Sequence, residues 1–363
     1  MKLLLITGSL PPMNCGVGDY TYRLALALAE DNSDRVAVLT SAAARGADGA
    51  GTIDIFPVID RWALSEASKA AKVIRGWNPD IVHVQYPTQG YGDRLLPDLL
   101  PAMSFLLGRK VVQTWHEGHG RRSPPTLFLK SFFPGGLVVV RPDYKEKLHP
   151  LLRWALWNKK YAFIPNASTM PKSELGQHEK HELRARFLKG QRRLMVFFGF
   201  VYPAKGVDLL FQVCDPATDA IVIAGETADS GDYLQAMERL ASTPPWQGKV
   251  TIAGFLPSHD ATRLMAAADA VILPFREGGG EWNTSLHAAV LQGSFVLTTS
   301  RNRNGYDPEH NVYYAKLNDV REMRAALGDH AGTRRERPGD TAGDEWRRIA
   351  ARHRQLYEEL LSG

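Results

Sequence analysis

Short apolar runs alternate with helix-patterned segments along nearly the whole chain, and this alternation constrains the fold more than any other feature of the sequence. Such alternation is typical of parallel β-sheets that helices cover on both faces, because parallel strands need a crossover connection. The runs predicted to be strands are 2–7, 35–39, 81–85, 110–115 and 136–140, and then 194–199, 220–224, 250–253, 270–273 and 294–298. The rhythm occurs twice, so we expect an α/β protein with two doubly wound sheets.

The length and composition also favour two domains. The 363 residues, of which 44% are hydrophobic and 23% charged, exceed one ordinary core and fit a globular chain. A charged stretch, 164–193, contains Pro165 and is predicted to connect the domains and to end in a solvated helix. Polar, glycine-rich stretches at 41–52 and 328–344 predict mobile loops. We therefore expect a first domain at 1–168, a second domain at 169–340 and a C-terminal helix at 341–363.

Charge and cysteine usage give weaker constraints on partners and compartment. The net charge of +5 favours polyanionic or anionic-lipid partners. Cys15 and Cys214 lie far apart in the sequence, so we expect no disulfide framework and a reducing compartment. The first residues, MKLLLITGSLPP, hold too short an apolar run for a signal peptide or a membrane span, and they predict a strand. These features favour a cytoplasmic protein.

The stretch GFVYPAKGVDLL, residues 199–210, predicts an anion site. Gly199 ends a predicted strand, and a helical pattern begins soon after Lys205. The first amides of a helix lack partners and its dipole favours negative charge, so a phosphate is the expected ligand. The alternative is a solvated lysine on the first turn, although a cation there is unfavourable by roughly a few tenths of a kcal/mol unless an anion is bound.

A second glycine-bearing segment lies between the first predicted strand and the first helix. Ligands of doubly wound sheets collect at this position, where Gly16 and Gly18 would let the backbone approach a ligand closely. Asp19 is a candidate cap for the helix. The alternative is a tight turn with an ordinary N-cap. A dinucleotide fingerprint needs a third glycine, so a dehydrogenase is disfavoured.

His116 follows a predicted strand in the stretch HEGHG. The spacing from His116 to His119 is one residue short of the zincin pattern and lies at a strand end, so we expect no metal site. A lone histidine in a loop is usually structural or exposed. Its position at the carboxyl end of a strand nevertheless makes His116 a candidate functional residue.

Four motifs in order resemble those of GT-B glycosyltransferases, specifically the retaining family four group. They are PPMNCGVGDYTYRLALAL, GFVYPAKGVDLL, PFREGGGEWNTSLHAAVLQGSFVLTTS and the final helix that carries Trp346. The resemblance spans nearly the whole chain. It implies two Rossmann-like domains facing a cleft, with a C-terminal helix that crosses back to the first domain. It also implies transfer of a sugar from a nucleotide-sugar donor in the second domain to a hydroxyl of an acceptor in the first, with retention. Lys205, Ser285 and the helix amides would stabilise the leaving diphosphate, so we expect that no metal is required.

The resemblance further implies roles for individual residues. The catalytic candidates are His116, Glu277 and Lys205, of which His116 and Glu277 would contact the donor sugar and Lys205 its diphosphate. The remaining donor-binding candidates are Gly16, Gly18, Gly199, Glu281, Asn283, Thr284 and Ser285, and the acceptor-binding candidates are Asp19, Tyr20 and Gln85. The acceptor would be a glycan, a lipid-linked molecule or a small molecule, and no cofactor beyond the nucleotide-sugar co-substrate is implied.

The chain departs from the family pattern at two points. Members commonly carry a second glutamate eight positions after the first, where this chain has Ser285, and alignment on AAVLQG places Ala288 there instead. Glu281 is a candidate substitute for the ribose contact, with an exposed loop carboxylate as the alternative. The family often has a second cation just after the glycine, where this chain has Phe200. Three glycines, 278–280, predict a flexible loop, and 283–285 predict a helix start able to hold phosphate.

Two further regions complete the sequence reading. Cations interleaved with Leu, Phe and Trp at 121–133 and 145–161 fit a surface that rests on anionic lipid, which would place the protein peripherally on the inner face of a membrane. A helix that buries its leucines under a basic face fits equally well. Nucleic acid is disfavoured, since no recognised binding module is present. The predicted final helix has Trp346, Ile349, Leu356 and Leu360 on one face, interrupted by His353.

The missing second glutamate keeps a rival function open, namely a non-catalytic protein that binds a sugar nucleotide or a glycan on the same scaffold. A related GT-B epimerase or phosphorylase is a third possibility. The phosphorylase would need a lysine for pyridoxal phosphate in a recognisable context, which the sequence does not offer.

Overall fold

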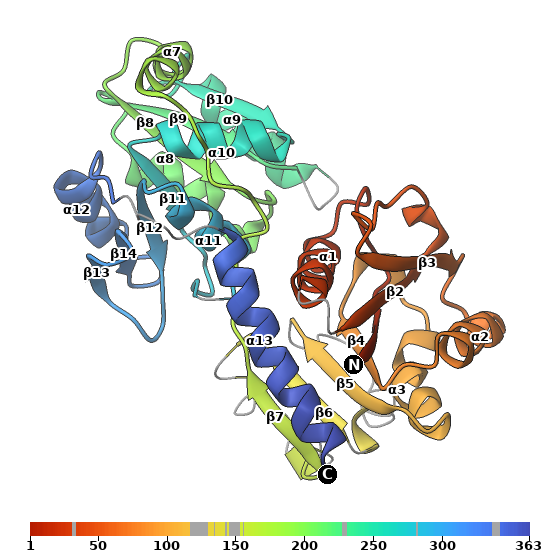
Figure 1. Ribbon diagram of the computed structural model, residues 1–363. Helices are drawn as coiled ribbons and strands as arrows, with labels where there is room; N and C mark the ends of the chain where they lie inside the picture. The colour runs from red at the N-terminus through yellow and green to blue at the C-terminus, as the bar shows by residue number, and fades with distance from the viewer. Residues whose placement is uncertain are drawn as a thin grey trace. The chain divides into compact units, whose positions relative to one another are not determined.

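The computed structural model describes residues 1–30, 34–116, 130–133, 135–141, 144, 153–154, 156–226, 231–280, 282–335 and 342–363. The chain forms two compact units (Figure 1). Unit 1 comprises Met1–Asn166 and Gly343–Gly363, and unit 2 comprises Ala167–Ala342. Each unit is built on its own seven-stranded sheet.

The sheet of unit 1 is entirely parallel among its described strands, with the order β3-β2-β1-β4-β5-β6-β7. The strands are β1 (Lys2–Ile6), β2 (Arg35–Ser41), β3 (Ile53–Ile59), β4 (Ile81–Tyr86), β5 (Lys110–Trp115), β6 (Gly135–Val139) and β7 (Lys159–Phe163). Parallel strands bring their carboxyl ends to one edge, so the segments that follow β1, β4 and β5 are neighbours.

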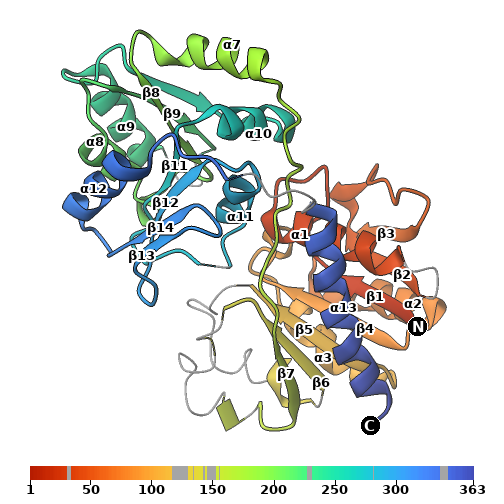
Figure 2. The same ribbon diagram turned by 60° about the vertical axis from the view of Figure 1, so that its left-hand side comes forward.

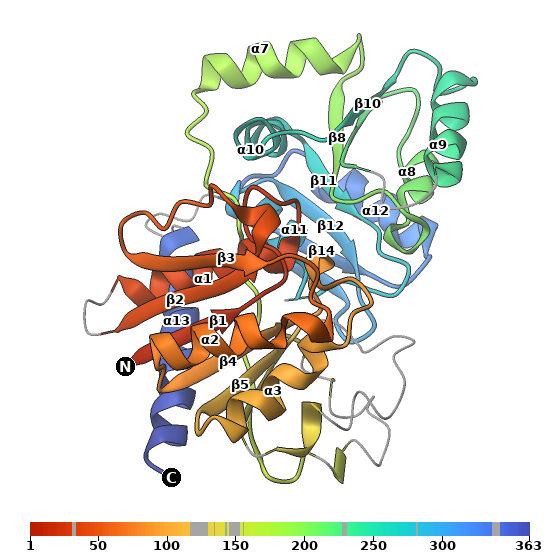
Figure 3. The same cartoon turned by 90° about the vertical axis from the view of Figure 1, so that its right-hand side faces the viewer.

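Helices cover both faces of this sheet: α1 (Gly16–Ala29), α2 (Ala67–Trp77), α3 (Leu96–Leu106) and α13 (Ala342–Leu361). Successive strand residues point to opposite faces, which sorts the core into two layers. On one face lie α2 and α3 (Figure 3), where Ile6 and Val84 share a core with Ile74 of α2 and Leu100 of α3. On the other face His83 of β4 meets Tyr357 of α13. The α/β expectation is confirmed for this unit.

The C-terminal helix α13 lies against the sheet of unit 1 (Figure 2) and belongs to that unit. The four residues of its predicted stripe, Trp346, Ile349, Leu356 and Leu360, are all buried, and so is His353. Gly136 of β6 makes this close packing possible, since a Cβ there would lie 3.0 Å from Leu360 Cδ1 and 3.3 Å from Leu356 Cδ2. Arg354 adds an ion pair of 2.8 Å to the buried Asp34.

The sheet of unit 2 has the order β10-β9-β8-β11-β12-β14-β13 and is parallel except for the β13–β14 pair. Its strands are β8 (Arg193–Phe198), β9 (Asp219–Ala224), β10 (Val250–Gly254), β11 (Ala270–Leu273), β12 (Phe295–Thr299), β13 (Gly305–Asp307) and β14 (Val312–Ala315). Its helices are α7 (Gln177–Leu188), α8 (Leu210–Val213), α9 (Asp232–Ser242), α10 (Ser258–Ala267), α11 (Thr284–Leu291) and α12 (Val320–His330).

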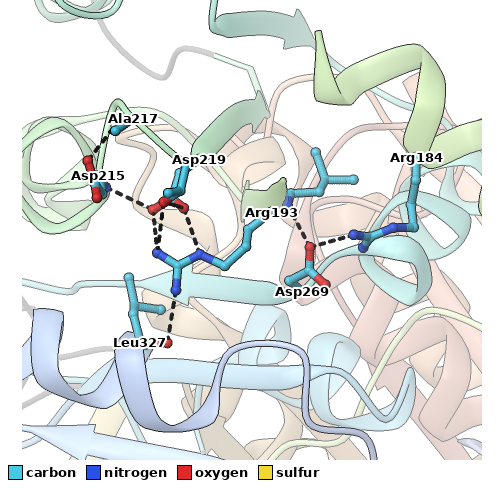
Figure 4. Close-up of polar contacts among 9 residues, drawn as sticks. Arg184, Arg193, Asp215, Ala217, Asp219, Asp269 and Leu327 are labelled. Carbon is cyan, nitrogen blue, oxygen red and sulfur yellow. Dashed lines mark hydrogen bonds and ion pairs between the residues drawn. The ribbon is translucent and has the colours of Figure 1, made fainter. Parts of the chain in front are cut away.

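Two ion pairs hold the amino ends of the unit 2 strands (Figure 4). Arg193, at the start of β8, binds the fully buried Asp219 of β9 with an Nε–Oδ1 distance of 2.7 Å. Arg184 of α7 reaches Asp269 at 2.7 Å, and the same carboxylate accepts a hydrogen bond from the Leu194 amide. The predicted solvated helix is confirmed, since none of the 12 residues of α7, all of them described, is buried. Arg184 connects this helix to the sheet through its ion pair with Asp269.

The ten predicted strands are all present, with ends within two residues of those expected, but four strands were missed. β3 carries Pro57 within an edge strand, and proline lowers the strand signal. β7, KKYAF, is the opposite edge and is only half-buried, so it reads as part of a basic segment. β13 and β14 are only 3 and 4 residues long. In the part of the chain that the structure describes, no helix has the length and apolar character needed to cross a membrane.

Candidate active site

In unit 2 the predicted donor-binding residues gather at the carboxyl edge of the sheet. Gly199 follows β8, and a Cβ on it would lie 3.9 Å from the Ser285 Cβ in the first turn of α11. The Ala204 carbonyl accepts a hydrogen bond of 3.0 Å from the Arg276 amide, which joins the loop after β8 to the loop after β11. Lys205 directly follows Ala204, and Glu277 directly follows Arg276. This hydrogen bond therefore holds the two segments that carry Lys205 and Glu277 together.

The segment that contains Lys205 differs from the predicted helix. Lys205 ends a 3-10 turn, η4 (Pro203–Lys205), Gly206 follows in the left-handed region, and a second turn, η5 (Val207–Leu209), leads to the four-residue helix α8. Gly206 interrupts the helix because it has a φ of 68°, and a Cβ on it would lie 2.2 Å from the Pro274 carbonyl oxygen. Lys205 thus does not lie at a helix N-terminus, which corrects the prediction.

The Lys205 ammonium lies over aromatic rings. Its Nζ is 4.5 Å from the centroid of Phe275, the second residue after β11, and 5.5 Å from that of Tyr202. Cation–π contacts of this length hold a cation in a defined place. The Lys205 ammonium therefore lies beside Phe275, at the start of the loop that carries Glu277.

The loop of Gly278, Gly279 and Gly280 makes hydrogen bonds through its amides, and its flexibility stays a prediction. The Gly279 amide donates to the Thr299 carbonyl at 2.6 Å, and the Gly280 amide donates to Asn283 Oδ1 at 2.9 Å. A Cβ on Gly279 would lie 2.7 Å from the Phe275 ring, so a larger residue would displace the loop. The glycines here allow close packing on β12.

Glu277 itself is exposed, and its backbone is fixed by Arg301. Arg301 Nε donates to the Glu277 carbonyl oxygen at 3.1 Å. The sequence reasoning missed Arg301, although its place just after a predicted strand is the signal that could have found it. Arg276 was also missed. It forms an ion pair with Asp208, which fastens the segment after Lys205 to the same loop.

The start of α11 carries the remaining donor candidates. Asn283 is the N-cap, and Thr284 and Ser285 form the first turn, all of them half-buried. Ala288, at one of the two positions where the family has its second glutamate, is buried in the core of the unit. Glu281 lies outside the described residues.

In unit 1 the structure brings together His116, Gln85 and Tyr20. His116 directly follows β5, and its Nε2 lies 2.9 Å from Gln85 Oε1 on β4. Its ring meets the ring of Tyr20, from α1, edge-on at a centroid distance of 4.6 Å. All three side chains are buried, so the cluster has a fixed geometry.

Burial keeps the histidines of this cluster neutral. Burial lowers the pKa of His116 to about 3, and the nearby His353 contributes to the same direction. Burial also lowers the pKa of His353 to about 4 and the pKa of His83 well below its usual value. His83 and Tyr357 were missed as members of the cluster, and His353 was noted only as the interruption of an apolar stripe.

Gly16 and Gly18 lie within the first turn of α1 and not in a loop before it, which corrects the prediction. α1 begins at Gly16 with Cys15 as its N-cap, and Asp19 donates its amide to the Cys15 carbonyl at 2.9 Å, so Asp19 is a first-turn residue and not the cap. A Cβ on Gly18 would lie 2.8 Å from the Ser9 carbonyl oxygen, which explains this glycine by packing. Burial raises the pKa of Asp19 to about 6, partly offset by Arg23.

The remaining predictions concern metal and membrane. Among the described residues no group of three His, Cys, Asp or Glu side chains is arranged to hold a metal ion. Most of the basic stretches 121–133 and 145–161 lies outside the described residues. Of the residues there that are described, Phe132, Trp154 and Trp157 are exposed, and Leu156 is buried.

Residues 192–330 match the family model described as Glycosyl transferases group 1. The chain carries a group 1 glycosyl transferase domain. This domain runs from the residue before β8 to the end of α12, and it contains Lys205, Glu277 and the first turn of α11. The recognition of a group 1 glycosyltransferase from sequence is confirmed, whereas its assignment to the retaining family four group stays a prediction. No curated protein matches it by sequence.

Solved structures resemble the glycosyltransferase over its whole length. HepE from Anabaena, in complex with UDP and glucose, is 15% identical with a TM-score of 0.67, covering 99% of this chain and 98% of that chain. Sucrose-phosphate synthase from Thermosynechococcus elongatus is 14% identical with a TM-score of 0.69, covering 100% and 99%. The catalytic domain of starch synthase IV from Arabidopsis thaliana, bound to ADP and acarbose, is 14% identical with a TM-score of 0.71, covering 100% of both chains. The GT-B fold is thereby confirmed.

Proposed function

We propose that the protein transfers a sugar from a nucleotide-sugar donor, held by unit 2, to a hydroxyl of a glycan, lipid-linked or small-molecule acceptor, held by unit 1. One observation carries the proposal. The segments that hold Lys205 and Glu277 and the first turn of α11 meet at the carboxyl edge of the sheet, within the residues that match the glycosyl transferase family. HepE in complex with UDP-glucose and starch synthase IV bound to ADP support a nucleotide-linked donor.

The chemistry requires stabilisation of a leaving nucleoside diphosphate. Negative charge grows on the diphosphate as the glycosidic bond breaks, so Lys205 and the hydroxyl of Ser285 would act by electrostatic stabilisation in a fixed geometry. Glu277 would hold the donor sugar, and His116 a substrate hydroxyl. We further propose retention at the anomeric carbon by same-face attack, with a donor phosphate oxygen taking the proton of the acceptor hydroxyl.

Donor hydrolysis without acceptor tests the proposal against the rival binding protein. A panel of nucleoside diphosphates is first screened by thermal shift, because a ligand of the folded state raises apparent stability. Nucleotide sugars of the best base are then incubated with the protein, and release of the diphosphate is followed. Stabilisation with release supports the transferase. Stabilisation without release, in the presence of varied acceptors, favours the non-catalytic sugar-nucleotide or glycan-binding protein.

Replacement of Lys205 by alanine is expected to weaken nucleoside diphosphate binding by about 1.5–3 kcal/mol, the scale of a hydrogen bond to a charged group. Calorimetry measures the affinity. Lys249, half-buried just before β10 and bound to the Pro216 carbonyl, provides the control, and Lys249→Ala should leave the affinity unchanged. Equal affinity of the Lys205 variant and the parent would remove Lys205 from the site.

Transfer is expected to continue in an excess of chelator. The reason is that organic cations and hydroxyls, with Lys205 foremost, take the part that a divalent ion has in other transferases. Turnover is measured with and without chelator after the protein has been freed of bound metal. Complete loss that magnesium or manganese restores would show that the diphosphate is held in another way.

We also propose that unit 1 contacts an anionic membrane surface. Trp154 and Trp157 are 60% and 75% exposed, Phe132 is 50% exposed, and the surrounding stretch 145–161 carries five cations against one acidic residue. Aromatic side chains beside cations suit the headgroup region of anionic lipid.

Co-sedimentation with phosphatidylserine vesicles should fall at least about tenfold in the Trp154→Ser, Trp157→Ser double variant, since burying one large apolar side chain is worth about 1.5–3 kcal/mol. Leu64→Ser, at another exposed apolar residue of unit 1, is the control and should bind as the parent does. Absence of binding by the parent protein at low salt would exclude the membrane contact.

A further inference from the structure

A chain of buried polar side chains runs from the C-terminal helix to His116 within unit 1. Tyr357 of α13 places its hydroxyl 2.6 Å from Nδ1 of His83 on β4. The other ring nitrogen of His83, Nε2, lies 3.3 Å from Nε2 of Gln85. Gln85 then reaches His116, with its Oε1 2.9 Å from the imidazole Nε2. Tyr357, His83 and Gln85 are at most 1% exposed, so the chain is shielded from water.

The amide of Gln85 gives the last link a direction. With the Gln85 amide in this orientation its oxygen accepts, so Nε2 of His116 carries the proton and donates it to Gln85 Oε1. Burial lowers the pKa of His116 to about 3, so the ring is neutral near pH 7 and carries one proton. Its Nδ1 therefore keeps a lone pair and is an acceptor.

The same reasoning sets the first links. Gln85 Nε2 donates to His83 Nε2, and the hydroxyl of Thr114 lies 2.7 Å from the same ring nitrogen. With Nε2 as the acceptor, the single proton of neutral His83 sits on Nδ1 and is donated to the Tyr357 oxygen. The hydrogen bonds then run in one direction. His116 Nε2 donates to Gln85, Gln85 Nε2 donates to His83, and His83 Nδ1 donates to Tyr357.

We propose that Tyr357, His83 and Gln85 are positioning residues that fix His116 as its Nε2-protonated tautomer. Its Nδ1 then accepts a hydrogen bond from a hydroxyl of the substrate. This inference rests on the proposed function, in which His116 contacts the substrate. It also names a specificity: a sugar that presents a hydroxyl at this position is accepted, and one that presents a carboxylate there is rejected, because two acceptors would face each other.

The tautomers can be read directly from long-range proton–nitrogen NMR correlations of histidine-labelled protein, with the His116 signals assigned by their loss in His116→Gln. The parent protein should show neutral His116 protonated at Nε2 and neutral His83 protonated at Nδ1. A His116 ring that is protonated at Nδ1, or that averages between the two forms, would overturn the proposal. This measurement requires no substitution at Tyr357, His83 or Gln85 and no enzymatic turnover.

Tyr357→Phe tests the role of the helix with little change in volume. Without the tyrosine oxygen, the proton of His83 should move to Nε2, the Gln85 amide should turn, and His116 should become protonated at Nδ1. The kcat/KM for donor turnover should fall about tenfold, the scale of one hydrogen bond.

The control is Tyr91→Phe, which removes another buried hydroxyl of unit 1, one that donates to the Ile6 carbonyl at 3.1 Å. It should leave the His116 tautomer as in the parent. An unchanged His116 tautomer in Tyr357→Phe would contradict the proposal that Tyr357 sets this tautomer through His83 and Gln85. If the parent protein turns over no donor at all, the proposed function fails, whereas the NMR result still decides whether His116 has the proposed tautomer.

Discussion

A chain that ends at Glu345 is expected to lose the folded state of unit 1 while unit 2 still binds a nucleoside diphosphate. The missing part of α13 buries Trp346, Ile349, Leu356 and Leu360. Burial of one large apolar side chain is worth about 1.5–3 kcal/mol, so the four together contribute about 6–12 kcal/mol. A whole domain is stable by only about 5–15 kcal/mol. Loss of the helix therefore removes most of the stability of unit 1.

Differential scanning calorimetry and diphosphate titration measure the two halves of this expectation. The control is a chain that ends at Leu361, which lacks two exposed residues and keeps the whole helix. The shorter chain should lose one unfolding transition and its turnover, and should keep its affinity for the diphosphate. Unchanged melting and turnover would mean that α13 is an appendage.

Point variants at the end of α13 give the same answer in smaller steps. Leu360 is buried against Gly136, so Leu360→Ala should destabilise unit 1 by about 2–5 kcal/mol. Its neighbour Leu361 is 40% exposed, and Leu361→Ala should stay within about 0.5 kcal/mol of the parent. Equal effects of the two substitutions would contradict the packing of the helix.

Most of the strands that are buried on both faces were predictable from sequence, and the four-residue β14 was the exception. Runs such as LLLI in β1 and AIVIA in β9 are almost continuously apolar, which is the signature of a covered parallel sheet. The two edge strands of unit 1 gave no such signal, because β3 contains Pro57 and β7 begins with two lysines, whereas the edge strand β10 of unit 2 was predicted. Their place in the sheet depends on pairing with a neighbour, which one sequence does not display.

The candidate site was predictable to the extent that it follows from strand ends. Lys205, Glu277 and Ser285 each follow a predicted strand or open a helix, and parallel topology brings such positions to one edge. The turn at Gly206 was not predictable, because the cause is the close approach of the Pro274 carbonyl oxygen from the segment after β11. Arg301 was missed for a similar reason, since its contact with the Glu277 carbonyl is made across two loops.

The polar cluster of unit 1 shows a different limit. His83 lies in the middle of an apolar strand, where a histidine reads as an ordinary core residue. Its significance comes from Tyr357, 274 positions away in the sequence, whose hydroxyl meets its ring. Periodicity placed the C-terminal helix face correctly, but it carries no information on which strand that face would meet.

Replacement of Glu277 by glutamine is expected to lower kcat by about 10²–10³-fold, the loss seen when one preorganised polar contact to a transition state is removed. The affinity for the nucleoside diphosphate should change little, because the proposed partner of Glu277 is the sugar. The loop itself should survive the change. Its contacts run through the Glu277 carbonyl and the Gly279 amide, neither of which belongs to the side chain.

Steady-state turnover and diphosphate calorimetry on the same preparation separate these effects. The matched control is Glu309→Gln at an exposed carboxylate of unit 2, which should retain both the turnover and the affinity of the parent. A loss of affinity as large as the loss of turnover would move Glu277 from the sugar to the diphosphate. Full turnover in Glu277→Gln would instead take this carboxylate out of the reaction, and Glu281 would then be the remaining acidic candidate in the stretch PFREGGGEWNTSLHAAV.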